Sequence, residues 1–169
     1  TPWTLDYWPG KTTYVDTPLV PIAAFTGFPQ NGPDVEPAAG TPVISAVYSA
    51  NSVTGPVVCS LPDTVTLTSL GTTTVPNPDF DPAIPGSQPS IARDYGFGTG
   101  GTVFLNGTPV GAGDIVSWTN TAITFTVAGG TAPGQYQIAV TRADSGSSSP
   151  IGVTLQVLAS CAKVRYVSP

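Results

Sequence analysis

Residues 86–157 alternate short β-branched and aromatic runs with turn residues, and this rhythm restricts the fold more than any other feature of the chain. Apolar side chains occupy every second position in Ile123–Val127 and again in Tyr136–Val140. A period of two is typical of a strand with one buried face. No window of a dozen residues combines helical apolar spacing with freedom from glycine and proline, of which the chain holds 19 each. The sequence therefore predicts an all-β fold.

Turn signals set the connections within this stretch. Asn106-Gly107 follows the apolar run Val103–Leu105 and favours a type I′ hairpin, because both central residues of that turn have positive φ. Gly129-Gly130 and the serine-rich segment 145–150 indicate later reversals. These turns predict one sandwich. Its expected core-facing residues are Trp118, Ile123, Phe125, Val127, Tyr136, Ile138 and Val140.

The first half of the chain is predicted to precede that sandwich and not to contribute strands to it. Residues 1–40 are predicted to form an extended arm rich in proline and aromatic residues, poorly suited to a central strand because proline donates no ladder hydrogen bond. Residues 41–85 are expected to be a small β region that ends in a proline-rich linker, 86–158 the sandwich, and 159–169 a tail. The strands expected in the small β region are Pro42–Tyr48, Pro56–Ser60, Thr64–Ser69 and Thr72–Val75, with Val65 and Leu67 facing inward.

Cys59 and Cys161 are the two cysteines of the chain, and their spacing matches no metal-ligand pattern. Two buried free thiols are one reading and a disulfide is the other. We predict the disulfide, which would tie the tail back to the first half. In the chain-entropy model, closing a loop of about 100 residues contributes roughly 4–5 kcal/mol. Together with the scarcity of lysine, a disulfide favours an extracellular or cell-surface location.

Several short motifs occur in one order along this part of the chain: Phe97-Gly98, Val103–Gly107, Trp118–Val127 and Gly134–Thr141. Together they resemble the IPT/TIG immunoglobulin-like domain of bacterial-type surface or secreted proteins, over residues 86–157. The resemblance implies an immunoglobulin-like β-sandwich that serves as a spacer or protein-contact module. It implies no catalytic residue, because the family has no common catalytic site, and it assigns Trp118 to packing. Residues 1–85 are not assigned to a family.

Composition excludes several function classes. The chain has no histidine, which excludes Ser-His-Asp and Cys-His catalysis as well as His-ligated copper, zinc or haem. A net charge of −5 disfavours nucleic acid as a partner, because binding its phosphates needs clustered lysine and arginine. The same charge argues against a likeness to the members of the IPT/TIG family that contact DNA. No apolar run approaches the roughly 20 residues that span a bilayer. We expect a non-enzyme without cofactor, nucleic-acid partner or membrane insertion.

Two local patterns each have a functional and a structural reading. Asp79 and Asp81 stand in a proline-rich segment, where carboxylates cap turns; paired carboxylates also serve glycosidases, and carboxylate oxygens bind Ca²⁺. Asn106-Gly107-Thr108 is a formal N-glycosylation sequon that coincides with the expected hairpin. In both cases we favour the structural reading.

The aromatic cluster Trp3, Tyr7 and Trp8 has three readings. Exposed rings stack on sugars, rings against a neighbour anchor a protein contact, and rings over the chain's own sandwich cover its edge. We expect the arm Thr1–Thr26 to pack on a neighbouring copy and to add a strand to an exposed edge. The candidate assembly residues are Trp3, Leu5, Tyr7, Trp8, Tyr14, Val15, Leu19, Val20 and Ile22.

The leading hypothesis is a non-enzymatic extracellular structural module, a subunit or segment of a cell-surface appendage or filament whose partners are copies of itself. One alternative is an accessory spacer module of a larger surface enzyme or redox protein, which a longer gene with His- or Cys-rich segments would favour. The other is a carbohydrate-binding module, for which Trp3→Ala and Trp8→Ala would abolish glycan binding.

Overall fold

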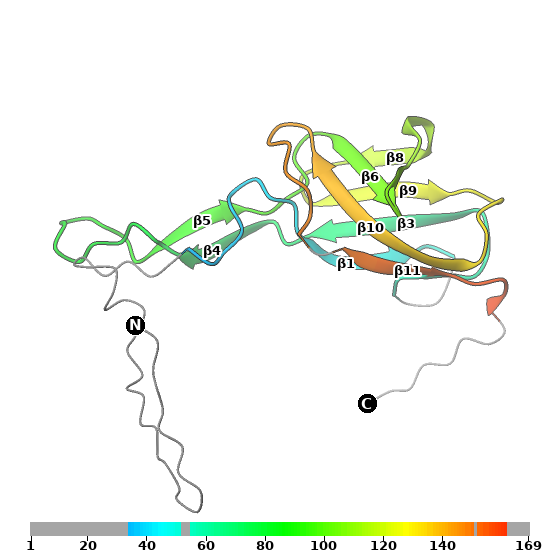
Figure 1. Ribbon diagram of the computed structural model, residues 1–169, viewed down its shortest axis with the longest axis horizontal. Helices are drawn as coiled ribbons and strands as arrows, with labels where there is room; N and C mark the ends of the chain where they lie inside the picture. Colours follow the sequence, from blue (N-terminus) through cyan, green and yellow to red (C-terminus); the bar gives the residue numbers. More distant parts are fainter. Residues whose placement is uncertain (1–33, 52–54, 151, 162–169) are drawn as a thin grey trace, which may run out of the picture.

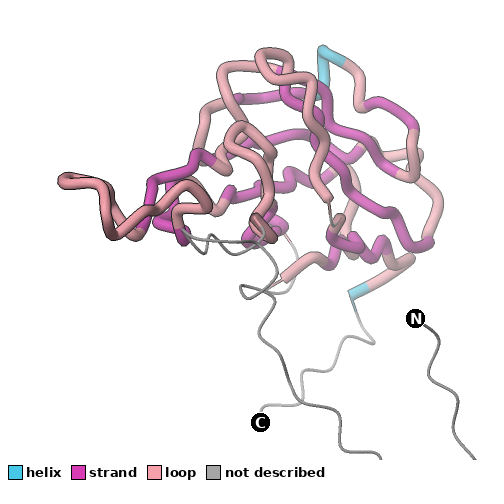
Figure 2. The backbone as a smooth tube through the Cα atoms, turned by 60° about the vertical axis from the view of Figure 1, so that its left-hand side comes forward, coloured by secondary structure: helices cyan, strands magenta, loops and turns pink. Residues whose placement is uncertain are grey.

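In the computed structural model, residues 34–51, 55–150 and 152–161 are described. They form two β-sheets packed face to face, with a two-stranded ribbon that projects from one end (Figure 1). Strands and loops account for nearly all of this part, and helix is confined to short segments (Figure 2). The predicted all-β sandwich is confirmed.

The first sheet is antiparallel and has the strand order β1-β3-β9-β8. Its strands are β1 (Ile44–Ser49), β3 (Asp63–Ser69), β9 (Ala122–Val127) and β8 (Ile115–Trp118). The short 3-10 turn η2 (Ala112–Asp114) leads into β8. Across β3 and β9, Val65 lies opposite Phe125 and Leu67 opposite Ile123. This sheet therefore combines strands from both halves of the chain.

The second sheet has the order β2-β11-β10-β6-β7. Its strands are β2 (Val57–Val58), β11 (Val153–Val157), β10 (Gly134–Arg142), β6 (Gly101–Leu105) and β7 (Thr108–Pro109). β2 runs parallel to β11, whereas the other neighbours are antiparallel. The ribbon pairs β4 (Thr72–Pro76) with β5 (Ser90–Asp94) and lies apart from both sheets.

The core lies between the two sheets, where alternate residues of facing strands interdigitate. Its buried members are Val47, Val58, Val65, Leu67, Phe97, Val103, Ile123, Phe125, Val127, Ile138, Val140, Leu155 and Val157. All seven aliphatic and Phe positions predicted to face inward on β3, β9 and β10 belong to this set. The period-two reading of the sequence therefore gives the correct register.

Trp118 and Tyr136 are partly buried rather than enclosed, and both pack against the core. Each is held by its polar end: Trp118 Nε1 donates to the Phe97 carbonyl at 3.1 Å, and Tyr136 Oη donates to the Ala132 carbonyl at 2.9 Å. Large amphipathic rings of this kind bury their apolar body and keep the polar tip near the surface. Their incomplete burial follows from that chemistry.

The sandwich begins near residue 44, not at residue 86 as predicted. β1 and β3 supply two of the four strands of the first sheet, and β2 is an edge strand of the second. The physical reason is that each of these strands has one apolar face, and the strands of the second half provide the apolar face that covers it. Alternation along the chain identifies such faces but does not say which distant strand will pair with them.

The proline-rich segment after Pro76 was predicted to be a linker, and it is instead the loop at the tip of the ribbon. Its ends are paired, since Val75 lies opposite Ile91 and the Asn77 amide donates to the Pro89 carbonyl at 3.0 Å. Prolines are tolerated here because the loop needs few ladder donors. The segment therefore joins two strands of one hairpin and not two domains.

The Asn106-Gly107 turn is confirmed, with φ of 50° at Asn106 and 78° at Gly107. It connects β6 to β7 by pairing Leu105 with Thr108. The Asn106 side chain then continues the ladder on β10: its Oδ1 accepts from the Gln137 amide at 2.6 Å, and its Nδ2 donates to the Gln135 carbonyl at 3.0 Å. The side-chain amide of Asn106 thus takes the place of a backbone peptide group where β6 turns away from β10. This role supports a turn, and not glycosylation, as the function of the sequon.

Candidate interaction surfaces

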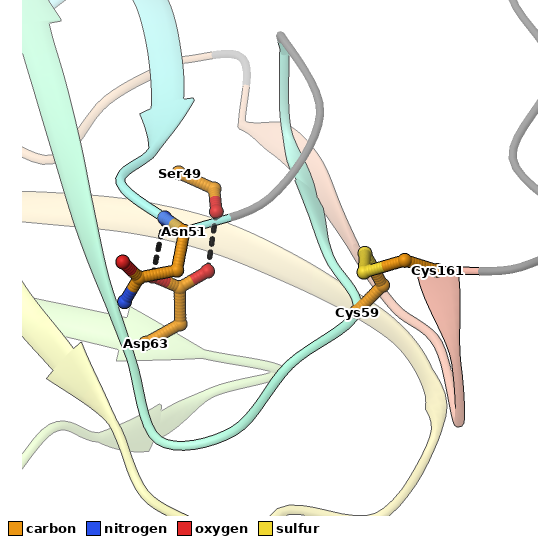
Figure 3. The surroundings of a disulfide bond; sticks show 5 residues. All are labelled: Ser49, Asn51, Cys59, Asp63 and Cys161. Atoms are coloured by element: carbon orange, nitrogen blue, oxygen red, sulfur yellow. Dashed lines mark hydrogen bonds between the residues drawn. A yellow bond between two sulfur atoms is a disulfide. The ribbon is translucent and has the colours of Figure 1, made fainter.

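A disulfide joins Cys59 and Cys161, as predicted, with their Cα atoms 4.8 Å apart (Figure 3). Cys59 follows β2 and Cys161 follows β11, the two strands that run parallel. The Leu158 amide donates to the Val58 carbonyl at 2.7 Å just before the bridge. The bond therefore secures β2, a two-residue edge strand that has little pairing of its own. It also ties the segment after β11, as far as Cys161, to the first half of the chain.

Asp63 is buried at the start of β3 and links this strand to the end of β1. Its carboxylate accepts from the Ser49 hydroxyl and from the Asn51 amide, the latter at 3.0 Å (Figure 3). The Thr64 amide donates to the same group at 2.7 Å. A buried carboxylate is stable only when hydrogen bonds compensate its desolvation. These bonds give Asp63 a structural role between β1 and β3.

Arg93 of β5 binds residues 34–37, in the last part of the predicted 1–40 arm. Its guanidinium makes a two-point contact with Asp34, at 2.9 and 2.6 Å, and is nearly enclosed. The same Nη1 also donates to the carbonyls of Glu36 and Pro37 at 3.2 and 3.0 Å. The hydrogen bonds between Arg93 and Asp34 lower the pKa of the Asp34 carboxyl and raise the pKa of the Arg93 guanidinium. The first described residues of the chain are therefore fixed to the ribbon.

Arg142 occupies the base of the ribbon, where it joins three segments. It contacts Asp144 through Nε and Nη2 at 2.8 and 2.6 Å, and through Nη1 it donates to Asp94 at 2.9 Å and to the Gly96 carbonyl at 3.0 Å. Asn120 Nδ2 donates to the other oxygen of Asp94 at 3.0 Å.

These contacts favour the ionised carboxylates. Hydrogen bonding to Arg142 lowers the pKa of Asp144 to about 2. The pKa of Asp94 is lowered first by the bond from Asn120 and then by Arg142. Both acids and the arginine are engaged with one another, so this cluster is a structural junction between the ribbon, the turn after β8 and the loop after β10.

A pocket of about 270 Å³ opens at the side of the sandwich, between β6 of one sheet and β8 of the other. It is lined by Gly100, Gly101, Thr102, Val103, Val110, Ala112, Ile115 and Trp118. Its floor requires glycine, because a Cβ at Gly101 would lie 2.0 Å from the Thr141 carbonyl oxygen and 3.1 Å from the Trp118 ring. The lining is largely apolar and carries no charged side chain.

The described ranges contain no group of three or more His, Cys, Asp or Glu side chains placed to hold a metal ion. Asp79 and Asp81 both lie in hydrogen-bonded turns; the Asp81 carboxylate caps its turn, whereas at Asp79 the capping side chain is that of Asn77. The Asp79 amide donates to Asn77 Oδ1 at 3.0 Å, and Asp81 Oδ1 accepts from the Ala83 amide at 2.8 Å. Each aspartate thus has a local role in the ribbon loop.

The candidate assembly residues of the arm lie outside the described residues. They are Trp3, Leu5, Tyr7, Trp8, Tyr14, Val15, Leu19, Val20 and Ile22. What the structure adds is the fixed point where the arm ends, at Asp34 on the ribbon.

Sequence reasoning missed both arginine clusters, although a signal for them was present. Arg142 has the same parity as Ile138 and Val140 on β10, and Arg93 the same parity as Ile91 on β5. A charged residue at an inward position must find a carboxylate or a set of carbonyls. The pocket carried no such signal, because its lining comes from three separate stretches of sequence.

No helix in the described part of the chain is long and apolar enough to cross a membrane. No family model matches the chain, and no curated protein matches it.

Proposed function

We propose that this chain is a non-enzymatic, extracellular structural module with an IPT/TIG-like immunoglobulin arrangement, and that it assembles with copies of itself into a surface appendage or filament. The arm Thr1–Thr26 provides the contact to the neighbouring copy. The observation that carries the proposal is the Arg93 clamp, which holds Asp34 and the carbonyls of Glu36 and Pro37 on a projecting ribbon. An arm that starts from a fixed, projecting point is presented to other molecules.

The ion pairs within the described part of the chain support a structural role. Arg93 and Arg142 are the basic residues among those described, and both are engaged in ion pairs within the chain. The polar groups of the sandwich thus serve its own architecture, which is what a spacer requires. The disulfide supports an extracellular setting, because such bonds persist in oxidising compartments.

Deletion of residues 1–26 tests the proposal. Burial of five of the arm's large apolar side chains contributes roughly 1.5–3 kcal/mol each before ordering costs, enough for a durable contact. We expect the shortened chain to stay folded and monodisperse in sedimentation velocity while the full chain forms higher assemblies. Thermal unfolding of both chains provides the control for folding. Assembly of the shortened chain at wild-type concentrations would refute the arm as the contact, and loss of folding would assign the arm to the chain's own core.

A further inference from the structure

We propose that the pocket between β6 and β8, together with the adjacent edge of β8, is the receptor for the segment Trp3–Trp8 of a second copy. The segment adds a short strand to β8 and places one large side chain in the pocket beside Trp118. This inference rests on the proposed function and deepens it by naming the surface on which the arm docks.

The receiving edge is open. β8 is the last strand of its sheet and, among the described residues, pairs only with β9. Val116 on β8 leaves 64% of its surface exposed, an unusual position for a large aliphatic residue on an edge strand. The register shift between Ile115 and Ser117 limits uninterrupted pairing to a few residues. The edge therefore fits a short added strand better than a long one.

The pocket is sized for a side chain. Drug-sized ligands occupy sites of roughly 300–1,000 Å³, and this pocket is smaller, at about 270 Å³. Its walls include Val110, Ala112 and Ile115, and the Trp118 ring is held in place by the bond to the Phe97 carbonyl. In strand addition, the free edge pairs with the backbone of the added strand, and a pocket beside it binds alternate side chains. The open edge of β8 and the apolar pocket next to it have this arrangement.

The segment Trp3–Trp8 has the matching pattern. It is the stretch between Pro2 and Pro9, so all of its backbone amides are present for pairing. Trp3, Leu5 and Tyr7 recur at every second position, which places them on one face of an extended strand. Its length also suits the interrupted edge of β8.

The place where the arm is anchored favours a second copy as the partner. The arm ends at Asp34, on the ribbon that projects away from the sandwich (Figure 1). The 26 residues from Trp8 to Asp34 can span at most about 90 Å, which is long enough for the segment to reach the pocket of a neighbouring copy. An arm of one copy in the pocket of the next is a heterologous contact, and repetition of such a contact gives a chain of copies.

The test uses the full chain with one residue changed in the wall of the pocket. Ala112 is exposed and small, so Ala112→Glu adds a carboxylate to the apolar pocket without removing a core contact. Gly113→Glu is the matched control, since it adds the same charge one residue away, where a Cβ meets nothing within 4 Å. We expect Ala112→Glu to raise the concentration needed for assembly by about tenfold or more and Gly113→Glu to leave it near the wild-type value. Unfolding midpoints show that both variants fold.

Photo-crosslinking identifies the occupant. Full chains labelled with ¹⁵N and carrying Tyr7→p-benzoylphenylalanine are assembled with unlabelled chains, irradiated and analysed by mass spectrometry. We expect crosslinks between labelled and unlabelled chains within residues 100–118. Crosslinks to the same residues of the arm's own chain would overturn the second-copy assignment. If deletion of 1–26 abolishes assembly but Ala112→Glu does not, the arm remains the contact and the pocket is not its receptor; if the deletion has no effect, the proposed function itself fails.

Discussion

Leu67→Ala should destabilise the whole sandwich, although Leu67 lies in the small β region that was predicted to precede it. Its side chain is completely buried on β3, a strand flanked by β1 on one side and β9 on the other. Leucine-to-alanine changes in cores cost roughly 2–5 kcal/mol, more where the surroundings cannot collapse into the space. Because neighbouring strands fix β3 on both sides, we expect about 3–5 kcal/mol.

Urea unfolding followed by the fluorescence of Trp118 measures this cost. The chain has three tryptophans, and Trp3→Phe with Trp8→Phe gives a background in which Trp118 alone reports. With a denaturant slope of about 1–3 kcal/mol/M, the midpoint should move down by roughly 2 M. Trp118 lies on β8, two strands away from β3. The probe therefore reports on the second half while the change is made in the first.

Leu70→Ala is the matched control, because it removes the same atoms from a side chain that is 47% exposed. Its cost should remain below about 1 kcal/mol. The reasoning would be refuted if Leu67→Ala changed the free energy of unfolding reported by Trp118 by less than about 0.5 kcal/mol. Such a result would mean that β3 and β8 do not unfold as one cooperative unit.

Two further predictions concern the bridge and the junction. Intact-mass measurement in denaturant should find no free thiol at Cys59 or Cys161 until reductant is added, and Cys161→Ala should lower the free energy of unfolding by roughly 2–5 kcal/mol; reactive thiols before reduction would contradict this. Arg142 holds the pKa of Asp144 at about 2, below its ordinary value of about 4, so their ion pair stabilises the fold fully above pH ~4 and is lost as the pH falls through ~2. Asp144→Asn should therefore be less stable than wild type near pH ~7 and equal to it below pH ~2, whereas a pH-independent difference would argue against the ion pair.

Much of the fold could be predicted because alternation reports burial directly. Val65, Leu67, Ile123 and Phe125 were assigned to the core from their spacing alone, and all four are buried. The Asn106-Gly107 turn was equally readable, since few residues accept positive φ at both positions.

The rest depends on contacts between residues far apart in the chain. The pairing of β3 with β9 joins positions about sixty residues apart, and the local pattern of either strand fits several partners equally well. Proline is frequent both in linkers and in hairpin loops, so the sequence of this segment predicts a linker equally well; the difference lies in whether the flanking strands pair. The pocket could not be predicted for a related reason: Gly101 and Ala112 line it only because β6 and β8, which belong to different sheets, come together.

The position of the bridge has a consequence for proteolysis. The exposed ribbon tip, with Ile84 58% accessible, is the kind of loop at which extracellular proteases cut. A cut there falls between Cys59 and Cys161 along the chain, so both fragments remain covalently joined. They also remain paired through β3 and β9, which lie on opposite sides of the cut. In the proposed filament, a nicked copy would keep both its arm and its pocket, so that the filament would tolerate surface proteolysis without losing its continuity.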